Sequence, residues 1–192
     1  MPPKAKYTKQ EITECALEMV RNHGVDIISA RNVAVALGTS TAPIFTAFSS
    51  IDELIFAVKE KAMELYKENY LSVALRSDLP FKSAGLNYIR FAKEEPELFK
   101  LVFMADGDSG VQSHYLPSAD PTSTDVLGAL TASHGIEDAP AKDIYNHLSV
   151  YTYGLAVLFA RGSCVFTMDD VDRMLSELFY ALKSRSKGEN NE

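Results

Sequence analysis

Apolar residues recur at positions three and four apart along most of this chain, which is the spacing of one face of an α-helix. No segment shows the sustained alternation of apolar and polar residues that predicts a strand. The pattern therefore predicts an all-α fold of about nine helices. We expect these helices over residues 9–23, 31–37, 41–48, 50–76, 81–95, 96–104, 121–134, 140–161 and 168–184, with a loop at 105–119.

The two shortest predicted helices are separated by a tight turn at Gly38, Thr39 and Ser40. Gly38 stands where the first helix must stop, and glycine takes a left-handed conformation there without penalty. Ser40 is expected to be the N-cap of the second helix. This pattern predicts a helix-turn-helix, whose second helix can enter the major groove of DNA. Helical hairpins also occur in proteins that never bind DNA, so the surrounding sequence must decide.

Residues 8–55 carry a series of short motifs in a fixed order. A helix that ends at Gly24 is followed by Ser29, Arg31, Val33 and Ala34, then Leu37, Gly38, Thr39 and Ser40, then Ile44, Phe45 and Phe48, then Ile51, Asp52, Glu53 and Leu54. In this order and spacing, the block resembles the N-terminal domain of the tetracycline-repressor (TetR) family of bacterial transcriptional regulators. The resemblance covers about a quarter of the chain.

The resemblance implies a helix-turn-helix DNA-binding domain over residues 1–50 and an effector-binding and dimerisation domain over 51–186, with 187–192 as a disordered tail. It implies a ligand-responsive transcriptional regulator, a repressor released from a palindromic double-stranded DNA operator by a small molecule. The residues expected to face DNA are Lys4, Lys6, Lys9, Arg31, Ser40, Thr41, Ala42, Phe45 and Thr46.

The chain departs from the family pattern in charge. Ala47 replaces the usual His or Tyr, Ile51 replaces the usual Lys, and no Lys or Arg lies between Asn32 and Val58. Basic residues are only slightly in excess over residues 1–50, while the whole chain carries a net charge of −7. Neutralisation of phosphates supplies most non-specific affinity for DNA. An alternative is therefore an all-α small-molecule sensor or partner-binding protein with weakened or lost DNA binding.

Aromatic and methionine side chains are frequent in the middle helices. As a group they predict an apolar chamber for a small apolar or amphipathic effector, although any single one of them also fits a plain core position. The residues expected to line this chamber are Met63, Tyr66, Tyr70, Tyr88, Phe91, Phe99, Phe103, Met104 and Tyr151.

The last two predicted helices are apolar over a wide arc, which either closes the core of a monomer or forms an interface. The resemblance implies a homodimer in which two helices of each subunit pack together. Two-fold symmetry would then set the reading helices about 34–36 Å apart, one turn of DNA. The expected interface residues are Tyr151, Leu155, Leu158, Phe159, Met174, Leu175, Leu178 and Phe179.

Signals for catalysis are weak, and an α-helical enzyme is the least supported alternative. The four histidines form no helix-borne metal pair, and the Asp106–Gly110 run lacks the Glu that a calcium loop needs, since Pro117 stands there. No Gly-x-Ser-x-Gly motif or phosphate-binding glycine loop is present. The sequence thus predicts no catalytic residue, no metal and no cofactor.

The remaining composition is that of a folded soluble domain. Cys15 and Cys164 are far apart and belong to no metal or redox spacing, so both are expected to be reduced thiols. The polar and basic start resembles no signal peptide, and no apolar run is long enough to span a membrane. We therefore expect a cytoplasmic protein without membrane contact.

Overall fold

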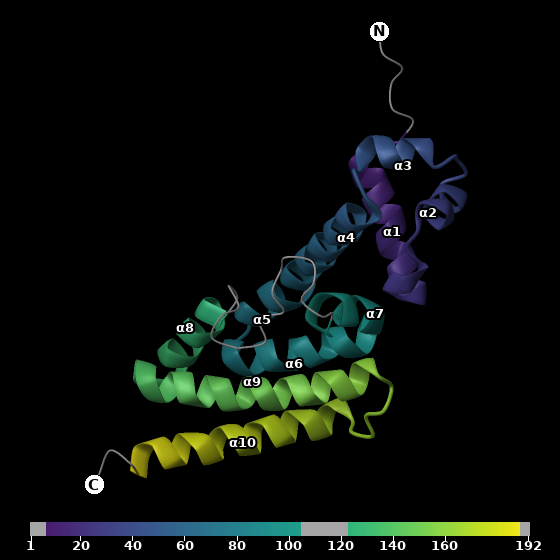
Figure 1. The fold of residues 1–192 in the computed structure, drawn as a ribbon. Helices are drawn as coiled ribbons and strands as arrows, with labels where there is room; N and C mark the ends of the chain where they lie inside the picture. Colours follow the sequence, from purple (N-terminus) through teal and green to yellow (C-terminus); the bar gives the residue numbers. More distant parts are fainter. Residues whose placement is uncertain (1–6, 105–122, 189–192) are drawn as a thin grey trace. The chain divides into compact units, whose positions relative to one another are not determined.

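The computed structural model describes residues 7–104 and 123–188. Its helices are α1 (Lys9–His23), α2 (Ala30–Ala36), α3 (Ala42–Ala47), α4 (Ile51–Tyr66), α5 (Ser72–Leu75), α6 (Pro80–Glu94), α7 (Pro96–Phe99), α8 (Ser123–His134), α9 (Asp138–Ala160) and α10 (Met168–Gly188) (Figure 1). A 3₁₀ turn spans Val25–Ile27. One π-turn, Lys67–Leu71, joins α4 to α5, and another, Lys100–Met104, extends α7.

The all-α prediction is confirmed over the described ranges, which contain no strand. Residues 67–71 join α4 to α5 without a break, so these two helices form one rod. The helices of the described residues then make nine continuous rods. Predicted and observed boundaries agree within about two residues, except that α10 runs to Gly188, past the expected end at residue 184. Residues 187 and 188 are therefore helical rather than part of a disordered tail. The predicted loop at 105–119 lies outside the described residues.

The described residues fall into two compact units. The head unit comprises residues 7–65 and 95–104, and the body unit comprises 66–94 and 123–188. Residues 51–65 and 95–104 thus belong to the same compact unit as the helix-turn-helix. The functional boundary expected at residue 50 stays a prediction, since a functional border need not follow packing.

In the head unit, α1 is built by strong local signals. The Thr8 side chain accepts a hydrogen bond from the Glu11 amide, and the Glu11 carboxylate accepts one from the Thr8 amide, which is a capping box. The buried face of α1 carries Ile12, Ala16 and Val20, all fully inaccessible to solvent. Burial of such a stripe, rather than helix propensity, supplies most of the stability of a helix this short.

The end of α2 has the geometry that the sequence predicts at Gly38. This glycine has a φ of 62°, and its amide donates to the Val35 carbonyl. The Thr39 amide donates to the Ala34 carbonyl, completing a Schellman motif. The side chain of Ser29 caps the other end of α2 by accepting from the Asn32 amide at 3.1 Å. Both ends of α2 are therefore fixed by hydrogen bonds.

The predicted cap of α3 is wrong. The N-cap is Thr41 rather than Ser40, and no side chain caps this helix. Thr41 already has helical dihedral angles, because the chain leaves the Gly38 turn within three residues and enters α3 directly. Pro43 occupies the first turn, as expected, where its missing amide hydrogen costs no bond.

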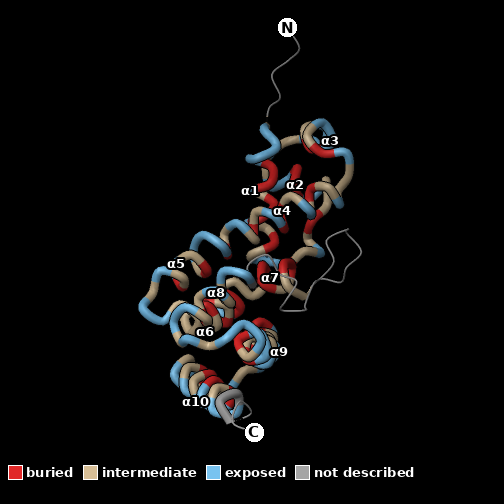
Figure 2. The backbone as a smooth tube through the Cα atoms, turned by 90° about the vertical axis from the view of Figure 1, so that its left-hand side faces the viewer, coloured by how far each residue is buried: buried red, intermediate tan, exposed pale blue. Residues whose placement is uncertain are grey.

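In the body unit, α6 packs on α9, and α9 runs beside α10 (Figure 1). Figure 2 shows buried and exposed positions alternating along α9 and α10, as amphipathic helices require. An ion pair of 2.7 Å joins Lys82 of α6 to Asp172 of α10. At Gly85 an added Cβ would stand 3.7 Å from Leu175, so α6 and α10 approach closely at this residue.

Among the described residues, no helix combines the length and the apolar character that crossing a membrane requires.

Candidate functional site

The face of α3 that points away from the head core is apolar and uncharged. Ala42, Phe45 and Thr46 are exposed, with 56% of the Phe45 surface accessible, while Ile44 is fully buried. These three exposed residues are spaced i, i+3 and i+4, so they share one face of the helix. The Thr46 hydroxyl donates to the Ala42 carbonyl at 2.9 Å, so its proton is already engaged.

The helix before the turn, α2, offers one cation. Arg31 is exposed and forms no ion pair with any residue of ranges 7–104 and 123–188. The neighbouring Asn32 side chain donates to the Ile27 carbonyl at 2.8 Å and so holds the preceding 3₁₀ turn. The Tyr7 hydroxyl donates to the Leu37 carbonyl at 2.5 Å, which ties the start of the described chain to the end of α2.

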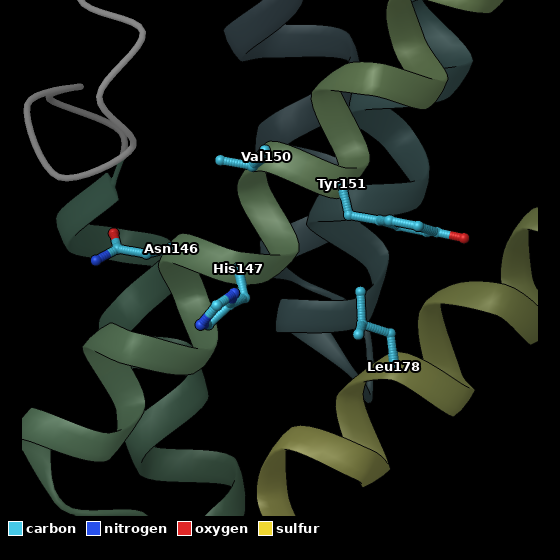
Figure 3. A pocket seen from close by; sticks show the side chains of 5 residues that line it. All are labelled: Asn146, His147, Val150, Tyr151 and Leu178. Atoms are coloured by element: carbon cyan, nitrogen blue, oxygen red, sulfur yellow. The ribbon is translucent and has the colours of Figure 1, made fainter.

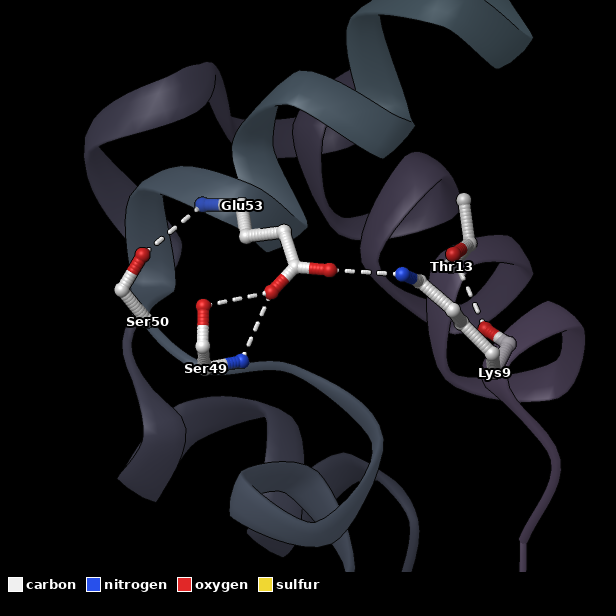
Figure 4. A network of polar contacts seen from close by, with 5 residues as sticks. All are labelled: Lys9, Thr13, Ser49, Ser50 and Glu53. Carbon is white, nitrogen blue, oxygen red and sulfur yellow. Dashed lines mark hydrogen bonds and ion pairs between the residues drawn. The ribbon is translucent and has the colours of Figure 1, made fainter.

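Lys9, expected to face DNA, is engaged within the head. Its ammonium lies 2.6 Å from the Glu53 carboxylate (Figure 4). It also lies 4.7 Å from the centre of the Phe48 ring. The other Glu53 oxygen accepts from the amide and the hydroxyl of Ser49, each at 2.7 Å. The Lys9 hydrogen bond, followed by those of Ser49, lowers the pKa of Glu53 to about 2. The carboxylate therefore stays ionised and keeps an opposing charge beside Lys9.

The structure brings most predicted DNA-facing residues to the exposed surface of the head unit. Ser40, Thr41, Ala42, Phe45 and Thr46 are consecutive or adjacent on α3 and the turn before it, and all are exposed. Arg31 and Lys9 lie on α2 and α1 of the same unit. Lys4 and Lys6 lie outside the described residues. The contact of these side chains with DNA stays a prediction.

The predicted effector residues are distributed over both units. Met63, Phe99, Phe103 and Met104 belong to the head unit, whereas Tyr66, Tyr70, Tyr88, Phe91 and Tyr151 belong to the body unit. Phe91 and Phe99 are fully buried and pack against other rings, so they serve as core. Their expected place in the lining of an effector chamber stays a prediction.

Within the body unit, an aromatic cluster surrounds Phe91. The Tyr66 and Tyr70 rings lie 5.2 and 5.1 Å from the Phe91 ring, and Tyr88 meets Tyr66 edge-on at 6.0 Å. The Tyr70 hydroxyl donates to the Glu94 carboxylate at 3.0 Å. These distances are those of attractive ring pairs. The cluster spans α4, its π-turn and α6, and π-turns are frequent at functional sites.

Two polar residues with little exposed surface lie close in sequence to these aromatic residues. Asn87 of α6 is 8% exposed, and its side-chain oxygen accepts from Arg90 at 2.9 Å. Lys59 of α4, in the head unit, is also only 8% exposed. Sequence reasoning missed Lys59, although its place next to Val58 and three residues before Ala62 puts it on the buried stripe of α4. A lysine with so little exposed surface buries its aliphatic stem against the protein while its ammonium group reaches solvent.

The predicted interface residues divide into two groups by exposure. Leu155, Leu175 and Phe179 are buried in the single protomer, and their contribution to an interface stays a prediction. The other five keep accessible surface, namely Tyr151, Leu158, Phe159, Met174 and Leu178.

Tyr151 and Leu178 line a groove of about 470 Å³ on α9 and α10, together with Asn146, His147 and Val150 (Figure 3). Val150 is 64% exposed, as is Tyr180 on α10. Sequence reasoning missed both residues, which extend the accessible apolar surface of these helices.

The His, Cys, Asp and Glu side chains of the described residues form no cluster of three that could hold a metal ion. Cys15 and Cys164 are free thiols, and burial raises the pKa of Cys15, which leaves it less reactive.

No protein-family model matches the sequence, and no curated protein matches it. Among solved structures, the chain is similar to a TetR-like transcriptional regulator from Rhodococcus sp. RHA1. The two share 17% sequence identity and a TM-score of 0.69, and the alignment covers 94% of this chain and 97% of that chain. At this identity the likeness concerns the fold. It agrees with the motifs of residues 8–55, so the chain has the fold of a TetR-like transcriptional regulator.

Proposed function

We propose that this protein is a DNA-binding transcriptional regulator without enzymatic activity, whose helix α3 reads the major groove. The observation that carries this proposal is the helix-turn-helix itself. Its turn is closed by Gly38, its second helix exposes Ala42, Phe45 and Thr46, and a regulator of the same fold exists. A helix presented in this way fits the major groove of B-DNA.

The test is selection of DNA from a random library at about 50 mM salt, a concentration at which phosphate contacts are strong. We expect one palindromic sequence to be enriched, and Phe45→Ala to weaken binding to it. Phe56→Ala is the matched control, because Phe56 is an exposed aromatic residue of α4 in the same unit but outside α2 and α3. If no sequence is enriched, the DNA-binding part of the proposal is wrong.

A second candidate is a sensor or partner-binding protein that no longer reads DNA. Two observations favour it: α3 carries no basic residue, and Lys9 is already paired with Glu53. The salt dependence of affinity separates the two candidates, since genuine phosphate contacts make affinity fall steeply as salt rises.

The response to a small molecule is the second part of the proposal. Lys59 supports it, since its side chain is mostly covered by the protein while it keeps its positive charge, and this cation would suit an acidic amphipathic effector. The test is a thermal-shift screen of aliphatic and aromatic carboxylates. Compounds that raise the melting temperature of the wild type should not raise that of Lys59→Met. Lys61→Met is the control, because Lys61 is more exposed on the same helix.

The third part is a homodimer formed through α9 and α10. Exposed apolar side chains on both helices support it, among them Val150, Leu158 and Tyr180, as does the groove of Figure 3. Such contiguous apolar surface marks interaction sites in soluble proteins. Regulation would follow if the effector bound the DNA-competent and released states with different affinity.

A further inference from the structure

The exposed face of α3 is mostly apolar and carries no charge. Ala42 contributes a methyl group, Phe45 an aromatic ring, and Thr46 a methyl group beside a hydroxyl whose proton already goes to the Ala42 carbonyl. Arg, Lys, Asn, Gln, Asp and Glu are the side chains that read base edges by bidentate or charged hydrogen bonds, and α3 contains none of them. Hydrogen-bond donation to bases therefore cannot be the main readout of this helix.

The major groove offers one apolar group that distinguishes one base pair from another, the 5-methyl group of thymine. Alanine, threonine methyl and phenylalanine side chains are those that contact it. Because all three occur together on one exposed face here, the chemistry of the helix matches that of the methyl group.

We infer that α3 recognises thymine 5-methyl groups, with Phe45 and Thr46 as the residues that determine specificity. This inference rests on the proposed DNA binding and adds the base that is read. The hydroxyls of Ser40 and Thr41, which precede the helix, and the free guanidinium of Arg31 are then left to contact phosphates, which position the head without reading sequence.

The experiment uses the full-length protein and the palindromic duplex selected from the library. Each thymine is replaced in turn, symmetrically, by deoxyuridine, which lacks the methyl group but keeps every hydrogen-bonding atom. At the contacted position we expect affinity to fall by about fourfold per methyl group, hence about fifteenfold for the symmetric pair. The Phe45→Ala variant changes an exposed residue. It should bind the duplex with thymine at the contacted base and the duplex with uracil there with equal affinity.

Two variants of Thr46 separate methyl from hydroxyl. Thr46→Val keeps a methyl group and removes the hydroxyl, and it should retain affinity. Thr46→Ser keeps the hydroxyl that donates to Ala42 and removes the methyl group, and it should lose affinity. The reverse order would overturn the inference, because it would show readout by the hydroxyl.

The outcomes also separate this inference from the function on which it rests. If a duplex is enriched but every uracil duplex binds as tightly as its thymine parent, methyl readout is wrong and DNA binding stands. If no duplex is enriched, both are wrong.

Discussion

The ammonium nitrogen of Lys9 lies 2.6 Å from a carboxylate oxygen of Glu53, 44 residues further along the chain. The pair joins the first turn of α1 to the first turn of α4, and it places a negative charge beside one of the few cations of the head (Figure 4). Lys9 must therefore be shared between Glu53 and any phosphate that approaches it. If the head unit binds DNA as proposed, Glu53 is expected to lower its affinity.

We predict that Glu53→Gln strengthens DNA binding. Glutamine can still accept the Ser49 hydrogen bonds but no longer neutralises Lys9. The plot of log affinity against log salt should steepen by about 0.9 for each phosphate contact that Lys9 gains. Fluorescence anisotropy over a salt series measures this slope. Glu64→Gln is the control, since Glu64 is an exposed partner of Lys61 on the same helix. An unchanged slope would show that Lys9 does not reach a phosphate.

The same carboxylate predicts a pH dependence of stability. The pKa of Glu53 in the folded protein is about 2, below its ordinary value of 4.5. Because the pKa of Glu53 is lower in the folded state than in the unfolded state, its ionised carboxylate stabilises the fold. This stabilisation is complete above the unfolded-state pKa and is lost as the pH falls toward the folded-state pKa. Urea unfolding at a series of pH values should show the wild type more stable than Glu53→Gln above about pH 5, with the difference shrinking below pH 4.5. A difference that stays constant down to pH 3 would contradict this.

The turn of the helix-turn-helix should depend on a glycine for conformational reasons alone. Gly38 has a φ of 62°, and a Cβ placed there would meet no atom within 4 Å. Gly38→Ala is thus expected to cost about 1–2 kcal/mol of unfolding free energy through left-handed strain. Gly128→Ala, in the interior of α8 and equally free of contacts, should instead stabilise by about 0.5–1 kcal/mol. Chemical denaturation measures both, and equal effects would exclude this explanation.

The proposed dimer makes a further prediction. Leu158 on α9 is 40% exposed, and Leu158→Glu should raise the dimer dissociation constant by about tenfold or more, because an unpaired charge would be buried. Val73→Glu is the control, since Val73 is 54% exposed on α5 of the same unit. Analytical ultracentrifugation measures both. A wild type that stays monomeric at all concentrations would refute the interface.

Sequence periodicity predicted the helices and the turn at Gly38 because these depend on local chemistry. It did not predict the features that depend on contacts between residues distant in sequence. Ser40 matches a cap by residue type, yet the path out of the turn makes Thr41 the cap. The burial of Phe91 and Leu155 depends on which helices pack against them, which the periodicity of one helix does not specify. The pairing of Lys9 with Glu53 joins two elements that no short motif connects.

Arg21 of α1 pairs with Glu95 at 2.8 Å, and α7 packs on α1 with Leu98 and Phe99 fully buried. The compact unit that contains the helix-turn-helix is thus assembled from two stretches of chain, 7–65 and 95–104. A single cut after residue 50 or 65 would strip α1 of this partner. The head unit is therefore not a contiguous segment that could be transferred to another protein on its own. Exchanging it between proteins requires the transfer of two stretches, residues 7–65 and 95–104, so that α7 is carried along with α1 to α4.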